Sequence, residues 1–448
     1  MIAEELARWG TSPWTAPPEV DAAVRRHLLD ALGTACAAAR LDAAAPAVTV
    51  ARGLGGPAEA TVIGFPGKIG APAAALANGT LIHALDFDDT HAGGLVHATA
   101  PVLPAVLAVG EEVGASGAQA LAALAVGLET VCRLGAAVPH GFHARGLHAT
   151  SACGVFAAAL AAARLYRLPP ERAAHALGIA GSLAGGLLEC VNTGAATKQL
   201  HPGFAAQAGI LAARLASAGA TGPASVFEGT YGLYGVHADR RVEPRDVLAG
   251  LGEVWELTRI TIKPYPVCQL GHAALDAGAA LRARLGGREA AETVVSTIVE
   301  IVVEIHPDAA QFVCGPGKER PASAYAAKFS LPWCLAQLLL DGELTVASFE
   351  RLDRPEVIAL AERVRHELVT SPGAAADQPG RVSALLGDGT RVTAVVDRSG
   401  GGPDDPRIED LVRGKARANL GARAETVLAL VADLPSPTAL MTALEAHP

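Results

Sequence analysis

The feature of this sequence that most limits its fold is a series of alanine-rich apolar segments separated by short breaks of glycine and proline. Apolar residues recur in these segments at helical spacing, which predicts a run of α-helices. Apolar residues make up 50% of the chain but aromatic residues only 4%, so alanine, leucine and valine must fill the core. Small side chains let helices pack closely. The expected helices cover residues 22–39, 100–113, 118–134, 151–165, 170–183 and 202–218.

The pattern changes from Lys263 onward, where β-branched residues and turn signals appear. Residues 293–305 are rich in valine and isoleucine and predict a strand, and residues 381–396 predict a hairpin around Gly387-Asp388-Gly389. Helical patterns over 332–340 and 355–368 lie between these strands, and residues 408–444 return to a helical pattern.

The helical and strand patterns together predict a mainly α chain with an α+β part, built as a large all-helical domain and a smaller α/β domain. A chain of 448 residues is also long for a single core. We expect a helical domain over residues 1–262, an α/β domain over residues 263–398, and a helical tail over residues 399–448 that returns to the helical domain.

Charge and cysteine usage exclude several classes of protein. The net charge of -9, with no basic run, argues against a nucleic-acid partner. The seven cysteines form no CxxC pair, so the spacing for a zinc or iron–sulfur site is missing, and they are expected to be buried thiols in a reducing compartment. The N-terminus lacks the pattern of a signal peptide, and the apolar run over residues 149–163 is short enough for a core helix. We therefore expect a cytoplasmic protein without a membrane partner.

Acidic, hydroxyl and imidazole side chains crowd together in the stretch HALDFDDTHAGGLVHATAPVLP, residues 83–104. Asp86 and Thr90 are four apart, which places them on one helical face if the preceding helix over residues 72–85 continues through them. His97 follows a Gly93-Gly94 break that can turn it toward that face. A structural alternative stays open, in which Asp88, Asp89 and Thr90 cap the next helix.

Three further polar clusters stand at junctions between loops and expected helices. They comprise His140, His143, Arg145 and His148 before the helix near residue 151, Lys198 and His201 before the helix near residue 202, and Lys263, Tyr265 and His272 at the start of the mixed region. Each histidine, taken alone, fits a structural role or a surface position better than a functional one. Helix N-termini that converge with lysine and histidine would nevertheless bind a small polyanion.

Five short motifs in this order resemble the MmgE/PrpD family. They are DFDDT with a following HxTxP, HAT at residues 148–150, TKxLHPG at 197–203, KPYPxCxxxH at 263–272 and AKFSLPWCLA at 327–336. The resemblance implies a larger helical domain formed by both chain ends, a smaller α/β lid domain, a homodimer, and a cofactor-free site at the domain boundary. The family includes 2-methylcitrate dehydratases, cis-aconitate decarboxylases and iminodisuccinate epimerases.

The resemblance also implies a set of site residues. The positions that match the family's active-site residues hold Asp86, Thr90, His97, His148, Lys198 and His272. We take all of these except Thr90 as catalytic candidates. The candidates for substrate binding are Thr90 and, from the polar clusters above, His201, Lys263 and Tyr265. Two positions depart from the family pattern: Ala149 follows His148 where proline is common, and Ala98 likewise follows His97. The spacing from Thr90 to His97 also differs between branches of the family, which leaves the substrate open.

The residue types suit chemistry beside a carboxylate. Dehydration, decarboxylation and epimerisation of a polycarboxylate all need a proton acceptor, a proton donor and cations. We assign Asp86 as base or base-orienting group, and His97 and His148 as proton-transfer groups. Lys198 and Lys263 would bind substrate carboxylates, Thr90 would position the substrate, and His272 would contact it from the lid.

We therefore expect a lyase that takes a small anionic substrate and needs neither metal nor cofactor. An epimerase or isomerase of a dicarboxylate such as iminodisuccinate is the first alternative. The second is a metal-dependent helical enzyme that uses the Asp-rich motif, although no second acidic motif accompanies it. A helical binding protein without catalytic activity is the third.

Overall fold

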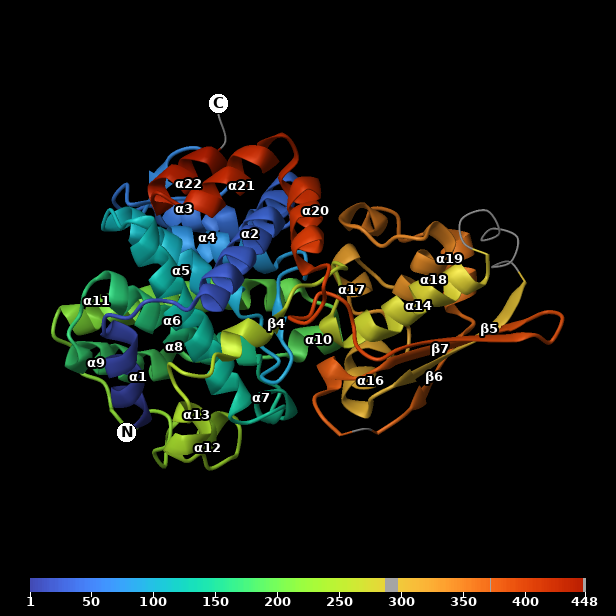
Figure 1. The fold of residues 1–448 in the computed structure, drawn as a ribbon, viewed down its shortest axis with the longest axis horizontal. Helices are drawn as coiled ribbons and strands as arrows, with labels where there is room; N and C mark the ends of the chain where they lie inside the picture. The colour runs from blue at the N-terminus through green and yellow to red at the C-terminus, as the bar shows by residue number, and fades with distance from the viewer. Residues whose placement is uncertain (287–296, 371, 446–448) are drawn as a thin grey trace. The chain divides into compact units, whose positions relative to one another are not determined.

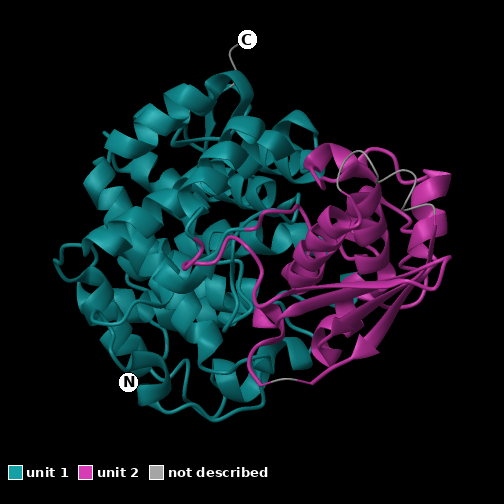
Figure 2. Ribbon diagram, turned by 45° about the vertical axis from the view of Figure 1, so that its right-hand side comes forward, with its two compact units in different colours: residues 1–190, 197–262, 406–448 teal, residues 191–196, 263–405 magenta. Residues whose placement is uncertain are grey.

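A computed structural model describes residues 1–286, 297–370 and 372–445 of the chain. Contacts between Cα atoms divide it into two compact units, which Figure 2 colours separately. Unit 1 holds residues 1–190, 197–262 and 406–448, and unit 2 holds residues 191–196 and 263–405. Helices predominate and the strands are few, so the predicted class, mainly α with an α+β part, is confirmed.

Unit 1 is built almost entirely of helices, several of which are labelled in Figure 1. Its principal helices before residue 262 are α1 (Ile2–Thr11), α2 (Pro18–Arg40), α3 (Ala45–Leu54), α4 (Ala71–His83), α5 (Thr99–Glu112), α6 (Gly117–Ala136), α8 (Ala149–Leu165), α9 (Pro170–Ala180) and α11 (His201–Ser217). All six alanine-rich segments form helices close to the predicted bounds.

Helix α8 forms the centre of unit 1. Its residues from Ala157 to Ala163 are fully buried, and it packs against α5, α6, α9 and α11. Small side chains allow the helices to approach this closely. A Cβ atom added to Gly209 of α11 would lie only 2.5 Å from the Cβ atom of Ala158, so no larger residue fits there. The expected core helix over residues 149–163 is therefore present.

Helices α4 and α11 cross where both carry glycine. A Cβ atom added to Gly79 would lie 2.7 Å from the Cα atom of Gly203, so the two backbones meet without side chains between them. Gly79 is one turn before His83, the last residue of α4, and Gly203 is two residues after His201, the first of α11. The crossing therefore brings the end of one helix close to the start of the other.

The C-terminal segment adds three helices to unit 1: α20 (Ile408–Leu420), α21 (Ala424–Asp433) and α22 (Pro437–Leu444). Figure 1 shows α20 and α21 in red beside the blue helix α2, against which both pack. Residues more than 300 positions apart in the sequence thus share one helical core.

Unit 2 contains a four-stranded sheet with the order β6-β5-β7-β8. Strand β5 (Ile298–Ile305) pairs in parallel with β6 (Val364–Leu368) and antiparallel with β7 (Gly380–Leu386), which forms a hairpin with β8 (Arg391–Val396). The helices α14 (His272–Arg284) and α18 (Leu331–Asp341) share an apolar core with this sheet. The hairpin prediction around Gly387 to Gly389 is confirmed.

One predicted helix in unit 2 is wrong in its second half. Helix α19 covers only Pro355–Ala361, and Val364–Leu368 forms strand β6. Pairing with β5 supplies the backbone hydrogen bonds of this segment, so a tertiary contact overrides the local helical pattern. The predicted strand over residues 293–305 forms from Ile298 onward, and residues 293–296 lie outside the described residues.

Among the described residues, α6 is the single helix with the length and apolarity that crossing a membrane requires. Of its most apolar window, 83% is buried inside the structure. Burial of this kind is what a core helix of a globular unit shows.

Candidate active site

The DFDDT segment after α4 is not helical. Helix α4 ends at His83, and Asp86 adopts a left-handed backbone conformation with a φ of 49°. Thr90 then begins the short strand β3 (Thr90–His91), which pairs with β4 (Ile260–Thr261). The prediction that a helix continues and places Asp86 and Thr90 on one face is therefore wrong. A left-handed residue cannot extend a right-handed helix, and aspartate is among the residues that adopt this conformation most readily.

Asp88 lies between two buried imidazole rings. Its Oδ2 atom is 2.8 Å from Nδ1 of His83 and 3.3 Å from Nδ1 of His97. Burial alone would raise the pKa of Asp88, but attraction to the two imidazoles holds this pKa well below its usual range. Because an ionised carboxylate only accepts hydrogen bonds, both imidazoles present an N–H from Nδ1. In the neutral His83 ring, the lone pair is therefore on Nε2.

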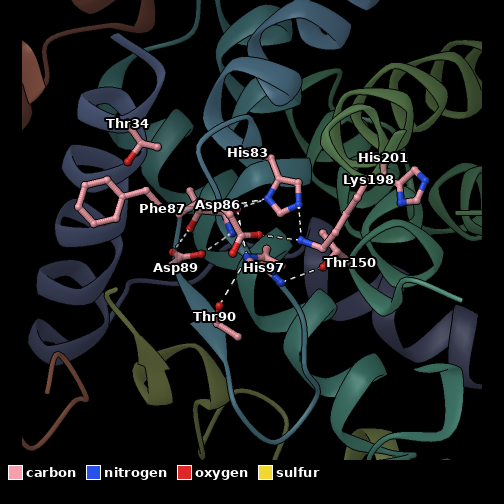
Figure 3. A network of polar contacts seen from close by, with 12 residues as sticks. Thr34, His83, Asp86, Phe87, Asp89, Thr90, His97, Thr150, Lys198 and His201 are labelled. Carbon is pink, nitrogen blue, oxygen red and sulfur yellow. Dashed lines mark hydrogen bonds and ion pairs between the residues drawn. The ribbon is translucent and has the colours of Figure 1, made fainter. Parts of the chain in front are cut away.

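Lys198 connects the His83 ring to Asp86 (Figure 3). Its Nζ atom donates to Oδ1 of Asp86 at 2.8 Å and lies 3.0 Å from Nε2 of His83. Burial, opposed by the attraction of Asp88 and aided by the charge of Lys198, lowers the pKa of His83 to about 3. The neutral His83 therefore accepts a hydrogen bond from the ammonium group. Asp88, His83, Lys198 and Asp86 form one continuous chain of polar contacts.

The backbone of His97 is bound by a residue at the start of helix α8. The backbone N–H of His97 donates to Oγ1 of Thr150 at 3.0 Å, and Oγ1 of Thr90 lies 3.5 Å from the ring Nδ1 (Figure 3). The centroid of this ring is 4.5 Å from that of His83 and 5.8 Å from that of His148. His97 therefore stands beside two further imidazole rings of the cluster.

His148 and His201 share a contact between like atoms. The two Nδ1 atoms lie 3.2 Å apart, so one ring must donate and the other accept. Burial and, to a smaller extent, the charge of Lys198 lower the pKa of His201 to about 4. The same two causes lower the pKa of His148 well below its usual value. The pair is therefore neutral around pH 7. His148 precedes α8 and His201 begins α11, so the convergence of two helix starts produces this contact.

The structure brings most of the predicted site residues together in unit 1: Asp86, Thr90, His97, His148, Lys198 and His201. These side chains are buried and belong to the loop after α4 and to the segments that open α8 and α11. Helices α5, α8 and α11 start beside one another here, because Thr150 binds the His97 backbone and Oγ of Ser151 donates to the His201 carbonyl at 3.3 Å.

Three predicted site residues belong to unit 2: Lys263, Tyr265 and His272. His272 begins α14, and its Nε2 atom lies 3.1 Å from the carbonyl oxygen of Val267. The hydroxyl group of Tyr265 donates to Asp276 at 2.8 Å. Lys263 is fully buried. Their participation in the site stays a prediction.

The two central aspartates of DFDDT play different roles. Asp89 accepts hydrogen bonds from the backbone N–H and the hydroxyl group of Thr99, the first residue of α5, and lies 2.8 Å from Nδ1 of His27. This arrangement matches the capping alternative for Asp89. Asp88 contacts His83 and His97 instead, so its carboxylate belongs to the polar cluster.

The sequence prediction missed two members of this cluster, His83 and Asp88. His83 ends a helix that is otherwise almost wholly apolar and stands five residues before Asp88. A histidine in such a position, directly before an acidic motif, was the available signal. Its pairing with Asp88 could not be read from the sequence, because it depends on the left-handed turn at Asp86.

The cluster also has a geometry that a metal ion could use. Ring nitrogen atoms of His83, His97 and His148, one from each ring, lie within 4.8 Å of one another, and all three residues are buried. Carboxylate support behind two of the rings is typical of histidine ligands. The ammonium group of Lys198 opposes such a use, because it lies 3.0 Å from Nε2 of His83 and would repel a cation.

A separate hollow of about 740 Å³ in unit 1 shares no residue with the cluster. It is lined by Trp14, Arg164 and Tyr166, among others, and Arg164 lies over the Trp14 ring at 5.5 Å from its centroid. We place the candidate site at the histidine cluster because that is where the groups for proton transfer converge.

Two family models match this chain. Residues 4–244 match the MmgE/PrpD N-terminal domain, and residues 265–432 match the MmgE/PrpD C-terminal domain. Together the matches cover the histidine cluster and both of the units described above.

Similar proteins carry related names. A cis-aconitate decarboxylase from Aspergillus terreus is 31% identical over 419 residues, which cover 89% of this chain and 85% of that protein. A cis-aconitate decarboxylase from Mus musculus is 32% identical over 361 residues, covering 77% of this chain and 71% of that protein. The cis-aconitate decarboxylase-like protein oryM from Aspergillus oryzae is 28% identical, covering 93% of this chain and 90% of that protein.

Proposed function

Because the chain belongs to the MmgE/PrpD family, we propose that it is a lyase of the dehydratase or decarboxylase type that acts on a small polycarboxylate. The names of its relatives support decarboxylation of a substrate like cis-aconitate as the first reaction to test. Dehydration of a substrate like 2-methylcitrate is the second. The proposed enzyme uses neither metal nor cofactor.

One observation carries this proposal. Asp88 fixes the tautomers of two imidazoles, and one of these accepts a hydrogen bond from the buried ammonium group of Lys198. The arrangement sets neutral imidazoles, which can act as bases, beside a cation that attracts carboxylates. A helical binding protein would not need two imidazoles oriented by one carboxylate.

The proposed roles follow from these contacts. Lys198 binds a carboxylate of the substrate, and the ion pair with Asp86 holds the ammonium group in place. His97 exchanges a proton with substrate carbon through Nε2, while Asp88 stabilises the imidazolium that forms. Thr90 positions the substrate, and the pair of His148 and His201 supplies a second proton-transfer group.

Each reaction has a simple balance of atoms. In dehydration, the base removes a proton from the carbon beside a carboxylate, and the hydroxyl group leaves with the C–O electrons and a proton from the acid. In decarboxylation, the C–C electrons stay on carbon as carbon dioxide leaves, and the acid protonates that carbanion. Neither reaction requires an oxidant or a reductant.

An NMR experiment in D₂O tests the proposal. Purified protein is incubated with cis-aconitate, 2-methylcitrate, citrate or iminodisuccinate. A decarboxylase releases carbon dioxide and leaves one deuterium in the product, and a dehydratase yields an alkene without loss of carbon. Folded protein that neither transforms any of the four compounds nor exchanges their C–H protons would refute the proposal.

Epimerisation of a dicarboxylate such as iminodisuccinate is the alternative. It is favoured by the presence of two imidazole groups, since the ring centroids of His97 and His148 lie 5.8 Å apart and could serve opposite faces of one carbon atom. Deuterium exchange at carbon with the substrate otherwise intact would identify this reaction in the same NMR experiment.

We also propose a homodimer and a cytoplasmic location. Three apolar side chains of α11 are unusually exposed for their type: Phe204, Leu211 and Leu215, at 46%, 42% and 48%. Their spacing places them on one face of the helix, which is a surface suited to a partner subunit. All seven cysteines are free thiols, as expected for a reducing compartment. Light scattering on wild-type protein and on Phe204→Glu, which should be monomeric, tests the dimer.

A further inference from the structure

A lysine of the C-terminal segment reaches the DFDDT loop. Lys415 of α20 donates from Nζ to the carbonyl oxygen of Phe87 at 2.6 Å, and the same atom lies 3.8 Å from the centroid of the Phe87 ring. Its ion-pair partner is Asp30 of α2, with 2.7 Å between Nζ and Oδ1. Both charged side chains are buried.

The carbonyl group of Phe87 occupies a critical place in the loop. Its peptide group joins Phe87 to Asp88, whose carboxylate orients two imidazoles, and the residue before Phe87 is the left-handed Asp86. Rotation of this peptide would therefore turn the Asp88 side chain away from the rings. The hydrogen bond from Lys415 opposes that rotation.

Helix docking alone does not explain this lysine. A buried ion pair contributes little net stability, because removing both charges from water costs about as much as their attraction returns, and an apolar pair of similar size often packs as well or better. Here the ammonium group contacts a loop carbonyl and an aromatic face in addition to its carboxylate. These extra contacts fix the conformation of the loop.

We propose that Lys415 is a positioning residue of the active site: it holds the Phe87–Asp88 peptide, and with it the Asp88 carboxylate, in the orientation that fixes His83 and His97. The ion pair with Asp30 directs the ammonium group of Lys415 at the loop. The kinetic consequence rests on the proposed function, whereas the effect on the loop does not.

The chain offers a matched control. Arg26 of α2 forms an ion pair with Glu409 of α20 at 2.9 Å, so it links the same two helices as Asp30 and Lys415 do. Neither member of this pair belongs to the loop. Arg26→Met therefore removes one α2–α20 ion pair and leaves the contact between Lys415 and Phe87 intact. Lys415→Met removes the other α2–α20 ion pair, with Asp30, together with the contact to Phe87.

Hydrogen–deuterium exchange of peptides that cover residues 84–91 measures the loop directly. The amide group of Asp86 donates to the His83 carbonyl at 3.0 Å and that of His91 to the Val96 carbonyl at 2.8 Å, so both amides report on the loop conformation. We expect exchange in these peptides to be faster by about tenfold or more in Lys415→Met and unchanged in Arg26→Met. Equal exchange in the loop of both variants and of the wild type would overturn the proposal.

The second measurement is kinetic, with whichever polycarboxylate the NMR experiment identifies. Misplaced catalytic groups reduce turnover more than binding, so Lys415→Met should lower kcat by about tenfold or more and change KM by less than about threefold. Arg26→Met should leave both near the wild-type values. A looser loop with unchanged kcat would also overturn the proposal. If no polycarboxylate reacts, the proposed function fails, and the exchange data still decide the role of Lys415.

A second variant covers the case in which Lys415→Met does not fold because Asp30 is left as an unpaired buried carboxylate. The double variant Asp30→Leu with Lys415→Met removes both charges and should fold. It should show the same faster exchange in residues 84–91. A folded double variant with a loop protected as in the wild type would contradict the positioning role.

Discussion

The Nζ atom of Lys198 lies 3.0 Å from the Nε2 atom of His83. Two cations do not share such a distance in a buried site, and the pKa of His83 is lowered by burial, so His83 is the neutral partner and Lys198 the charged one. This contact fixes the tautomer of His83, because Nε2 must accept the hydrogen bond. It also connects the carboxylate of Asp88 to the ammonium group of Lys198 through one neutral ring.

Replacement of Asp88 by asparagine should reduce turnover with little change in stability. Asparagine keeps the shape but cannot stabilise an imidazolium or fix both tautomers, so kcat should fall by about a hundredfold or more. The adjacent Asp89→Asn is the control, because Asp89 caps α5 through Thr99. It should lower the free energy of unfolding by about 1 kcal/mol and leave kcat within about threefold. Equal kinetic losses in both variants would refute the distinction.

His97 and Asp88 should behave as one unit in a double-mutant cycle. Because Asp88 acts through the His97 ring, His97→Gln combined with Asp88→Asn should cost little more than the worse single variant. Single-turnover rates of the wild type, both single variants and the double variant provide the test. Independent action would instead give losses that multiply.

Lys198→Met should weaken binding of a polycarboxylate by about 1.5 to 3 kcal/mol, which is the worth of a charge-assisted hydrogen bond. Calorimetric titration with cis-aconitate measures this loss. The control is Lys68→Met, which removes a lysine paired with Glu111 at 2.9 Å outside the cluster and should bind normally. An unchanged dissociation constant together with early thermal unfolding would show that Lys198 is structural.

Stability should fall as the pH falls, through the buried histidines. The pKa of His201 is about 4 in the folded protein, below the usual value of about 6.5, so the unfolded chain takes up the proton first. The stabilising contribution is present above pH 6.5 and is lost as the pH falls toward 4. Between pH 7 and pH 5 the wild type should lose about 2 kcal/mol more than His201→Asn in denaturant titrations. Parallel pH profiles would contradict the assigned shift.

Activity should survive removal of metal ions. Three histidines offer a possible ligand set, but the ammonium group of Lys198 beside His83 repels a cation. Dialysis against EDTA should leave turnover unchanged within about twofold, since the protein groups suffice for proton transfer. Loss of activity that Zn²⁺ or Mg²⁺ restores would show that the metal-dependent alternative is right.

Local patterns in the sequence determined the helices of unit 1 and the hairpin of unit 2. Alanine-rich segments such as α8 form helices from their own spacing and composition, and Gly387-Asp388-Gly389 favours a turn wherever it occurs. The pattern over residues 355–368 was misleading, because its second half pairs with β5, and no local signal reports a distant strand.

The sequence alone also pointed to the chemistry, since acidic and imidazole groups at the starts of helices are rare in so apolar a chain. Only the tertiary structure decided which groups act on one another. The left-handed turn at Asp86 directs Asp88 to His83 and His97. The crossing of α4 and α11 at their glycines brings Lys198 to the His83 ring. The crossing is a consequence of close packing between segments far apart in the sequence, and local periodicity does not reveal which segments will meet.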